Sequence, residues 1–125
     1  QTQYCFDIPR LKSFMETARN LGLDKQCHIL IGVGPLRSAA TAEWMTKNIP
    51  GVVIPDKTIE ILRRTPKESQ LQEGKKICID IINQVRSING VAGVHIMAYL
   101  LDHFIPEIVD ESVLSKERKS RHSDD

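Results

Sequence analysis

The sequence predicts an α/β fold built on parallel strands, and three observations lead to this class. Strand-like and helix-like segments alternate in the order strand, helix, strand, helices, strand, helix. The central strand-like run, residues 28–33, is almost continuously apolar, as expected for a parallel strand buried on both faces. The 125 residues suffice for one small domain with its own core, and the composition is ordinary for a globular protein.

The N-terminal segment is predicted to form a strand and then a helix. Residues 2–6 are rich in strand formers. Asp7 can cap the helix, and Pro9 falls in its first turn, where a missing N–H costs little. Gly22 is placed to end this helix as a left-handed cap. Its predicted apolar face consists of Leu11, Phe14, Met15, Ala18 and Leu21.

The second strand and two short helices follow. Gly34-Pro35 ends the strand of residues 28–33 abruptly. Ser38 can cap a short helix that carries several apolar residues, including Trp44, and Asp56 can start another. These segments therefore complete a strand–helix unit before the longest helix.

The remaining elements are a long helix, a third strand and a last helix. The long helix is predicted over about residues 68–88, and Gly74 inside it is expected to weaken it slightly. Residues 93–98 form the third predicted strand. Residues 100–109 are predicted to be helical, with a disturbance at Pro106.

Composition excludes several classes of protein. The formal net charge of +1 gives no reason to expect nucleic acid or an acidic membrane as partner. No apolar run is long enough for a transmembrane helix, and no secretory signal opens the chain. Three widely spaced cysteines argue against a disulfide framework or a zinc site, so we expect a cytoplasmic protein with no bound metal. Residues 1–114 are predicted to form the domain, and the charged tail 115–125 to lack fixed structure.

Alternating strands and helices imply a parallel sheet, which closed folds complete in two ways. A doubly wound nucleotide-binding sheet would need a glycine fingerprint after its first strand, and the sequence has none. A (β/α)8 barrel takes about 250 residues, so this chain has material for roughly the last three of its eight units. Because the chain opens in a strand without Met, we expect the natural polypeptide to continue upstream.

Function in parallel α/β folds gathers where strands end, and this rule selects three places. Gln3 offers an amide that could pair with a ligand such as a pterin ring, or could bond a neighbouring strand. Gly34-Pro35, followed by Leu36, permits close approach of a ligand, or forms a plain turn. His95 lies inside the third strand, where a histidine is usually a satisfied core residue, and no metal partner stands at ligand spacing.

Four segments, in order and spacing, resemble the methylenetetrahydrofolate reductase family. The first resembles its Thr-Gln-x-x-x-Asp segment, the second its Pro-Gly-Ile-x-Pro strand end, the third its Val-x-Ile-Pro step and the fourth its closing Gly-Leu-His strand. In this chain they are Thr2-Gln3 with Asp7, Ile31-Gly32-Val33-Gly34-Pro35, Val53-Ile54-Pro55 and Gly93-Val94-His95. The resemblance covers residues 1–99.

The resemblance implies the C-terminal βα units of an incomplete TIM barrel that binds FAD. It implies hydride transfer from NADH or NADPH, through the flavin, to 5,10-methylenetetrahydrofolate, which gives 5-methyltetrahydrofolate. Gln3 corresponds to a family glutamine that bonds substrate and nicotinamide, and Gly34-Pro35-Leu36 to a segment bordering the folate. With His95 these are the predicted substrate-binding residues, while the catalytic acid and most flavin contacts belong to earlier strands.

The chain also departs from the family pattern. Residues 98–101 read Ala-Tyr-Leu-Leu, where many members carry Thr-Leu-Asn-Arg with a substrate-binding arginine. Ala39 or Ala40 replaces a loop aromatic that packs against folate. A related pterin carrier or a loss of activity therefore stays open. The alternative hypothesis is a non-catalytic barrel remnant, or a subunit that completes a barrel with a partner chain, so we expect an oligomer or a partner.

Overall fold

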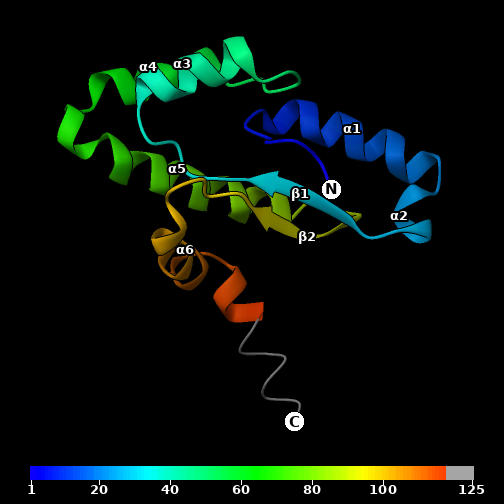
Figure 1. Cartoon of the computed structure of the whole chain (residues 1–125). Helices are drawn as coiled ribbons and strands as arrows, with labels where there is room; N and C mark the ends of the chain where they lie inside the picture. The colour runs from blue at the N-terminus through cyan, green and yellow to red at the C-terminus, as the bar shows by residue number, and fades with distance from the viewer. Residues whose placement is uncertain (118–125) are drawn as a thin grey trace.

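The computed structural model of the chain describes residues 1–117 and contains helices and parallel strands in alternation (Figure 1). This arrangement confirms the predicted mixed α/β class with parallel strands. The described elements are α1 (Ile8–Asn20), α2 (Leu23–Gln26), β1 (Ile29–Val33), α3 (Ala39–Asn48), α4 (Asp56–Arg64), a 3-10 turn η1 (Lys67–Ser69), α5 (Gln70–Arg86), β2 (Val91–Ile96), a second 3-10 turn η2 (Asp102–Phe104) and α6 (Ile105–Glu111).

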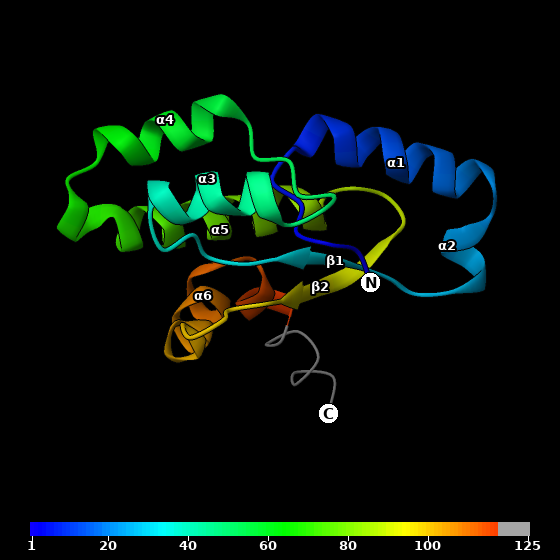
Figure 2. The same ribbon diagram turned by 45° about the horizontal axis from the view of Figure 1, so that its top comes forward.

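The sheet is open and consists of β1 and β2, which pair in parallel. Their register aligns Ile31 with Val94 and Gly32 with His95, after an irregularity between Ile29 and Leu30. In both ribbon views α3 and α4 lie on one side of the strands and α6 on the other (Figure 1, Figure 2). The long crossover between the two strands contains α3, α4 and α5, as expected for a parallel pair.

The predicted strand over residues 2–6 is wrong as a strand, because the described pairing is a single bridge between Tyr4 and Gly32. In this segment, side-chain oxygens accept hydrogen bonds from backbone N–H groups that would pair with a neighbouring strand in a regular sheet. The Thr2 hydroxyl accepts the Gly32 N–H at 2.9 Å, and the Gln3 side-chain carbonyl accepts the Tyr4 N–H at 3.0 Å. Such local bonds compete with regular sheet pairing.

The N-terminal segment nevertheless runs along β1. The Thr2 N–H donates to Leu30 O at 3.0 Å, and the Cys5 N–H donates to Gly32 O at 2.9 Å. On the other edge, the Met97 N–H donates to Val33 O at 2.8 Å, just beyond β2. Because alternate residues of a strand present their backbone groups to opposite edges, β1 lies between the N-terminal segment and β2.

The hydrophobic core draws on every helical layer and on β1. Its most completely buried side chains are Met15, Ile31, Leu62, Ile82 and Ile108, from α1, β1, α4, α5 and α6 respectively. Full burial of one such side chain stabilises a fold by about 1.5–3 kcal/mol. Helix α5 contacts both strands and also α1, α4 and α6, so it is the central helix of the domain.

Local signals placed the starts of α1 and α3 and the end of α1 correctly. The Asp7 carboxylate accepts the Arg10 N–H at 3.1 Å, and the Ser38 hydroxyl accepts the Thr41 N–H at 3.1 Å, which confirms both predicted caps. Gly22 has a φ of 75° and follows the end of α1, as predicted for a left-handed residue. The short helix α2 that follows was not predicted.

Other predictions need correction. Phe14 and Leu21, expected on the apolar face of α1, are exposed, and so is Trp44 in α3. The predicted third strand, residues 93–98, corresponds to β2, which runs from Val91 to Ile96. Pro106 does not disturb a helix, because it stands in the first turn of α6, where its missing N–H has no intrahelical partner to lose.

Gly74 has a packing role that its helix propensity does not show. A Cβ built on Gly74 would lie 1.7 Å from the backbone oxygen of Leu36. The loop after β1 therefore packs directly on the backbone of α5, which only glycine permits. Gly74 holds this loop against the core, and the expectation that it merely weakens the helix missed this contact.

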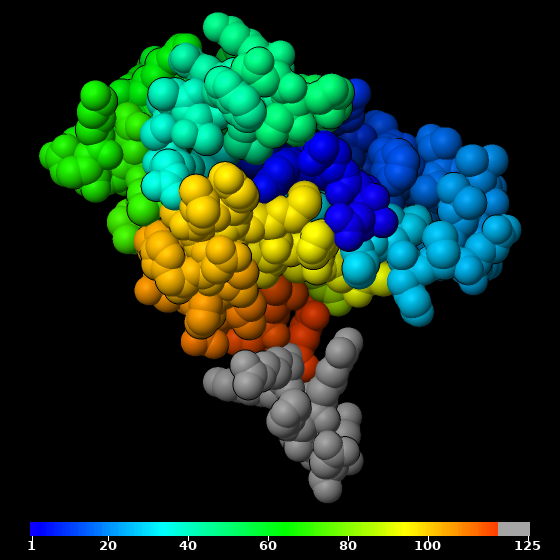
Figure 3. All heavy atoms as spheres, viewed as in Figure 1, coloured from blue at the N-terminus to red at the C-terminus, as the bar shows by residue number. Residues whose placement is uncertain are grey.

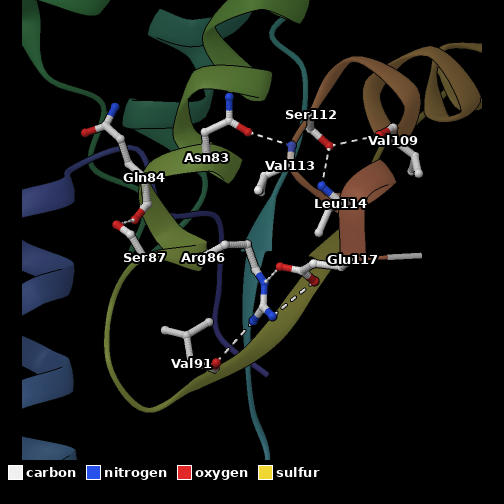
Figure 4. Close-up of polar contacts among 10 residues, drawn as sticks. All are labelled: Asn83, Gln84, Arg86, Ser87, Val91, Val109, Ser112, Val113, Leu114 and Glu117. Atoms are coloured by element: carbon white, nitrogen blue, oxygen red, sulfur yellow. Dashed lines mark hydrogen bonds and ion pairs between the residues drawn. The ribbon is translucent and has the colours of Figure 1, made fainter. Parts of the chain in front are cut away.

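The C-terminal part is fastened to α5 by polar contacts (Figure 4). Asn83 accepts the Val113 N–H at 2.8 Å, and Arg86 pairs with both carboxylate oxygens of Glu117 at 2.9 and 3.1 Å. Residues 114–117 are helical, so the first three residues of the predicted tail 115–125 are ordered. The rest of that tail lies outside the described residues.

Candidate functional site

The carboxyl ends of the strands meet at one face of the molecule, and a groove of about 740 Å³ lies there. Figure 3 shows this face, with the yellow loop after β2 beside the cyan-to-green α3 and the dark-blue N-terminal segment. We call it the strand-end groove. Its lining comes from the N-terminal segment, the β1 loop, α3 with the residue that follows it, and the β2 loop, and consists of Tyr4, Pro35, Arg37, Ala40, Thr41, Trp44, Met45, Ile49, Met97, Tyr99, Leu100 and Leu101.

Tyr4 connects the N-terminal segment with the loops that follow β1 and β2. Its hydroxyl donates to Met97 O at 2.9 Å, and its ring stacks on Phe6 at a centroid distance of 5.9 Å. A Cβ on Gly34 would lie 2.3 Å from Met97 O and 2.6 Å from the Tyr4 ring. Only glycine allows the loop after β1 to pass this close to Met97 and Tyr4. Packing alone therefore explains a glycine at this position, and no ligand is needed to explain it.

Burial controls the ionisation of two groups near the strands. It raises the pKa of Tyr4 above its ordinary value, with a smaller contribution from Cys78. Tyr4 therefore stays protonated near neutral pH and keeps its hydroxyl as a donor. Burial also raises the pKa of Cys78 to about 12, so this thiol is not available as a nucleophilic thiolate.

Gln3 lies beside a second, smaller hollow of about 200 Å³, formed mainly by the N-terminal segment and α1. Its side-chain carbonyl is held by the Tyr4 N–H, and its amide NH2 has no partner within residues 1–117. The side chain is exposed, so this NH2 can donate to a ligand. Tyr4 lines both hollows and is the link between them.

The other predicted binding residues lie in three different surroundings. Pro35 lines the strand-end groove. Leu36 is 1% exposed, so its side chain belongs to the core and only its backbone can approach a ligand. His95 is exposed on β2, opposite Gly32 in the register, and is not the core histidine that its apolar strand favoured. The structure thus joins Pro35 with the strand ends but separates it from Gln3.

Of the residues that line the groove, only Pro35 was in the predicted site, and three of the others are large, exposed apolar or aromatic residues. Trp44 in α3 is 58% exposed, and Tyr99 in the loop after β2 is 83% exposed. Leu100, 66% exposed, has a φ of 59°. A left-handed non-glycine residue costs on the order of 1–3 kcal/mol and is often found at functional sites. No local sequence signal marks such a φ, although the unusual run of apolar residues after the third strand was visible.

The described residues provide neither a metal centre nor a complete flavin site. Within residues 1–117, no group of three or more His, Cys, Asp or Glu side chains could hold a metal ion. The glycines after β1 do not form a cradle for a diphosphate, because the space beside Gly34 is filled by Met97 and Tyr4. The residues present therefore do not fit FAD by themselves. No helix in this part of the chain is long and apolar enough to cross a membrane.

Comparison with known proteins identifies the family. No curated protein and no solved structure matches the chain. The family model described as "Methylenetetrahydrofolate reductase" matches residues 1–113, which is nearly the whole described part of the chain. This range includes the N-terminal segment, both strands and the loops that line the strand-end groove. The chain belongs to the methylenetetrahydrofolate reductase family.

Proposed function

We propose that the chain is part of a flavin-dependent oxidoreductase that reduces 5,10-methylenetetrahydrofolate to 5-methyltetrahydrofolate. The hydride would come from NADH or NADPH and pass through FAD, whose chemistry is that of the cofactor itself. The family match over residues 1–113 is the observation that carries this proposal. A groove at the carboxyl ends of the strands, where parallel α/β folds place their ligands, supports it.

We further propose that the elements are the C-terminal βα units of a (β/α)8 barrel. The N-terminal segment, β1 and β2 lie side by side in chain order, as neighbouring barrel strands do. FAD would then be held mainly by βα units other than those described here, which agrees with the filled space beside Gly34. The folate-type carrier would meet this chain at its strand ends.

Among the predicted binding residues, Gln3 has the best position for a direct contact. Its free amide NH2 can donate to a carbonyl of the pterin or of the nicotinamide. Pro35 would contact the carrier as part of the groove wall. Gly34 and Leu36 would act by shaping the β1 loop, and His95 would contact a ligand only on the open side of β2.

The test is Gln3→Ala in the intact natural protein. Loss of one transition-state hydrogen bond should raise the activation free energy by roughly 2–4 kcal/mol. This lowers kcat/KM for methylenetetrahydrofolate by about 30- to 1000-fold. Gln1→Ala, which removes an exposed glutamine from the same segment, should leave the rate unchanged. If Gln3→Ala kept full activity, the role of Gln3 would be wrong. If the unaltered protein reduced no methylenetetrahydrofolate, the proposed function itself would be wrong.

The alternative is a non-catalytic barrel piece, either a remnant or a subunit completed by a partner chain. Within residues 1–117, β2 pairs with β1 on one edge and with no strand on its other edge, which favours this alternative. Unpaired strand edges promote association with other strands. This alternative requires that the chain alone aggregates or stays partly unfolded and becomes ordered with a complementary half. A cooperative thermal transition of the monomeric chain would count against it.

A further inference from the structure

One buried glutamine connects three helices, one of which lines the strand-end groove. Gln70, in the first turn of α5, is 9% exposed. Its side-chain carbonyl accepts the Ala39 N–H at 3.1 Å, and its NH2 group donates to Thr65 O at 3.1 Å. Ala39 is the first residue of α3, and Thr65 directly follows α4. Because helix ends leave such backbone groups without intrahelical partners, Gln70 supplies a partner to the start of one helix and to the end of another.

These two hydrogen bonds need an amide at position 70. The Ala39 N–H requires an acceptor and Thr65 O requires a donor, and an amide presents both from one planar group. An ionised carboxyl group of the same length could accept from Ala39 but would place a second acceptor against Thr65 O. A buried polar group that loses its partner destabilises the arrangement around it. Both partners are backbone groups that do not titrate, so the side chain at position 70 alone decides whether both bonds form.

The same face of α5 also fixes the loop that precedes α3. Gly74 lies four residues after Gln70, and residues four apart share one face of a helix. The backbone of Leu36 packs directly on Gly74, where there is no room for a Cβ. Leu36 and Ala39 are therefore held on α5 at two successive points, and the chain between them, which carries Arg37, is fixed at both ends.

The segment held in this way forms one wall of the strand-end groove. Pro35, Arg37, Ala40 and Thr41 line the groove, whereas Gln70 does not. Gln70 therefore acts on a bound ligand through the segment that it holds. We propose that Gln70 is a positioning residue, which fixes the loop after β1 and the start of α3 for binding of the folate-type carrier. This inference rests on the proposed function, and it assigns Gln70 to substrate affinity and not to hydride transfer.

Gln70→Glu in the intact natural protein tests this role, because the new carboxyl group has two forms. Protonated at about pH 5.5 it can accept and donate as the amide does, since burial raises the pKa of a carboxyl group, whereas ionised at about pH 8 it cannot donate. Relative to wild type, KM for methylenetetrahydrofolate should be raised about tenfold at the higher pH and unchanged at the lower pH. The value of kcat should be unchanged at both. Gln72→Glu, which adds an exposed carboxyl group to the same helix, should change neither constant.

Gln70→Met separates the effect of position from that of charge. Methionine has about the length of glutamine, carries no charge and can form neither bond, so KM should rise about tenfold at both pH values. A wild-type KM in this variant would overturn the inference, and so would a raised KM in Gln70→Glu that persists at the lower pH. A lower kcat with an unchanged KM would also overturn it, because a purely structural role reduces only the amount of active enzyme.

Trp44 provides a readout that does not depend on reduction. It lies in α3 and is the one tryptophan of the chain. Its fluorine NMR signal in protein labelled with fluorotryptophan, assigned with Trp44→Phe, should differ between Gln70→Glu and wild type at the higher pH and coincide at the lower pH. If the signal behaves in this way but no methylenetetrahydrofolate is reduced, the positioning of α3 by Gln70 is supported and the proposed function fails. If reduction proceeds and the two signals coincide at both pH values, the inference fails while the proposed function stands.

Discussion

Two arginines at opposite ends of the sheet show different uses of the same side chain. Arg86 lies at the amino end of β2, where it donates to Val91 O at 3.1 Å and pairs with both oxygens of Glu117. Its side chain is 18% exposed. Arg37 follows the carboxyl end of β1, is exposed and has no partner within residues 1–117.

This difference agrees with the division of labour in parallel α/β folds. Residues at the amino ends of the strands serve stability, whereas those at the carboxyl ends serve ligands. The Arg86 contacts connect α5, the start of β2 and the C-terminal segment (Figure 4). The Arg37 side chain makes no such connection within residues 1–117. The two ends should therefore respond differently to substitution.

Gly74→Ala should have the largest effect on stability, because it affects the support of the Arg37 loop. The new methyl group would fall 1.7 Å from Leu36 O, and a backbone atom cannot move aside by rotation. Such overpacking costs about 3 kcal/mol, and the gain in helix propensity of about 1 kcal/mol offsets only part of it. We expect a net loss of roughly 2 kcal/mol in the free energy of unfolding, measured with urea.

Gly51→Ala provides the control for this substitution. Gly51 has a φ of 84° and no atom within 4 Å of a built Cβ, so it tests backbone strain without a clash. Its cost should be about 1 kcal/mol. A Gly74→Ala variant that is as stable as wild type would mean that the β1 loop does not rest on α5, and the two regions would then be independent.

Arg86→Met should have the next largest effect. It keeps a long apolar side chain but removes three hydrogen bonds at a mostly buried site. We expect a loss of about 1.5 kcal/mol. Arg63→Gln is the matched control, since Arg63 is 54% exposed and pairs with Glu43 and Glu60 on the surface, where solvent screens ion pairs, so its loss of stability should be smaller. Equal losses in the two variants would show that burial does not distinguish these arginines.

The predictable parts of the fold are those fixed by local chemistry. Asp7 and Ser38 cap helices because their side chains reach N–H groups three residues away. Gly22 ends α1 because it adopts a positive φ without strain. The N-terminal strand failed as a prediction because Thr2 uses its hydroxyl to bond Gly32, a partner 30 positions away that no propensity reveals.

The candidate site was less predictable than the fold. The rule that ligands bind at strand ends selected Gln3 and Pro35, each of which lines a hollow, and their binding roles stay predictions. Leu36 is in the core because Gly74, on a distant helix, leaves room for its backbone. Within residues 1–117 no acidic side chain pairs with Arg37 or lines the groove beside it, and this is visible only in the folded chain.

Arg37→Gln should have the smallest effect on stability, and it tests the comparison most directly. An exposed side chain without partners contributes little to folding, so the free energy of unfolding should change by less than about 0.5 kcal/mol. Combined with Arg86→Met, it should add no more than this amount, because the two arginines share no partner. A loss above about 1 kcal/mol in urea unfolding would mean that Arg37 supports the fold. Its conformation would then be explained without a ligand, and the contrast between the two ends of the sheet would disappear.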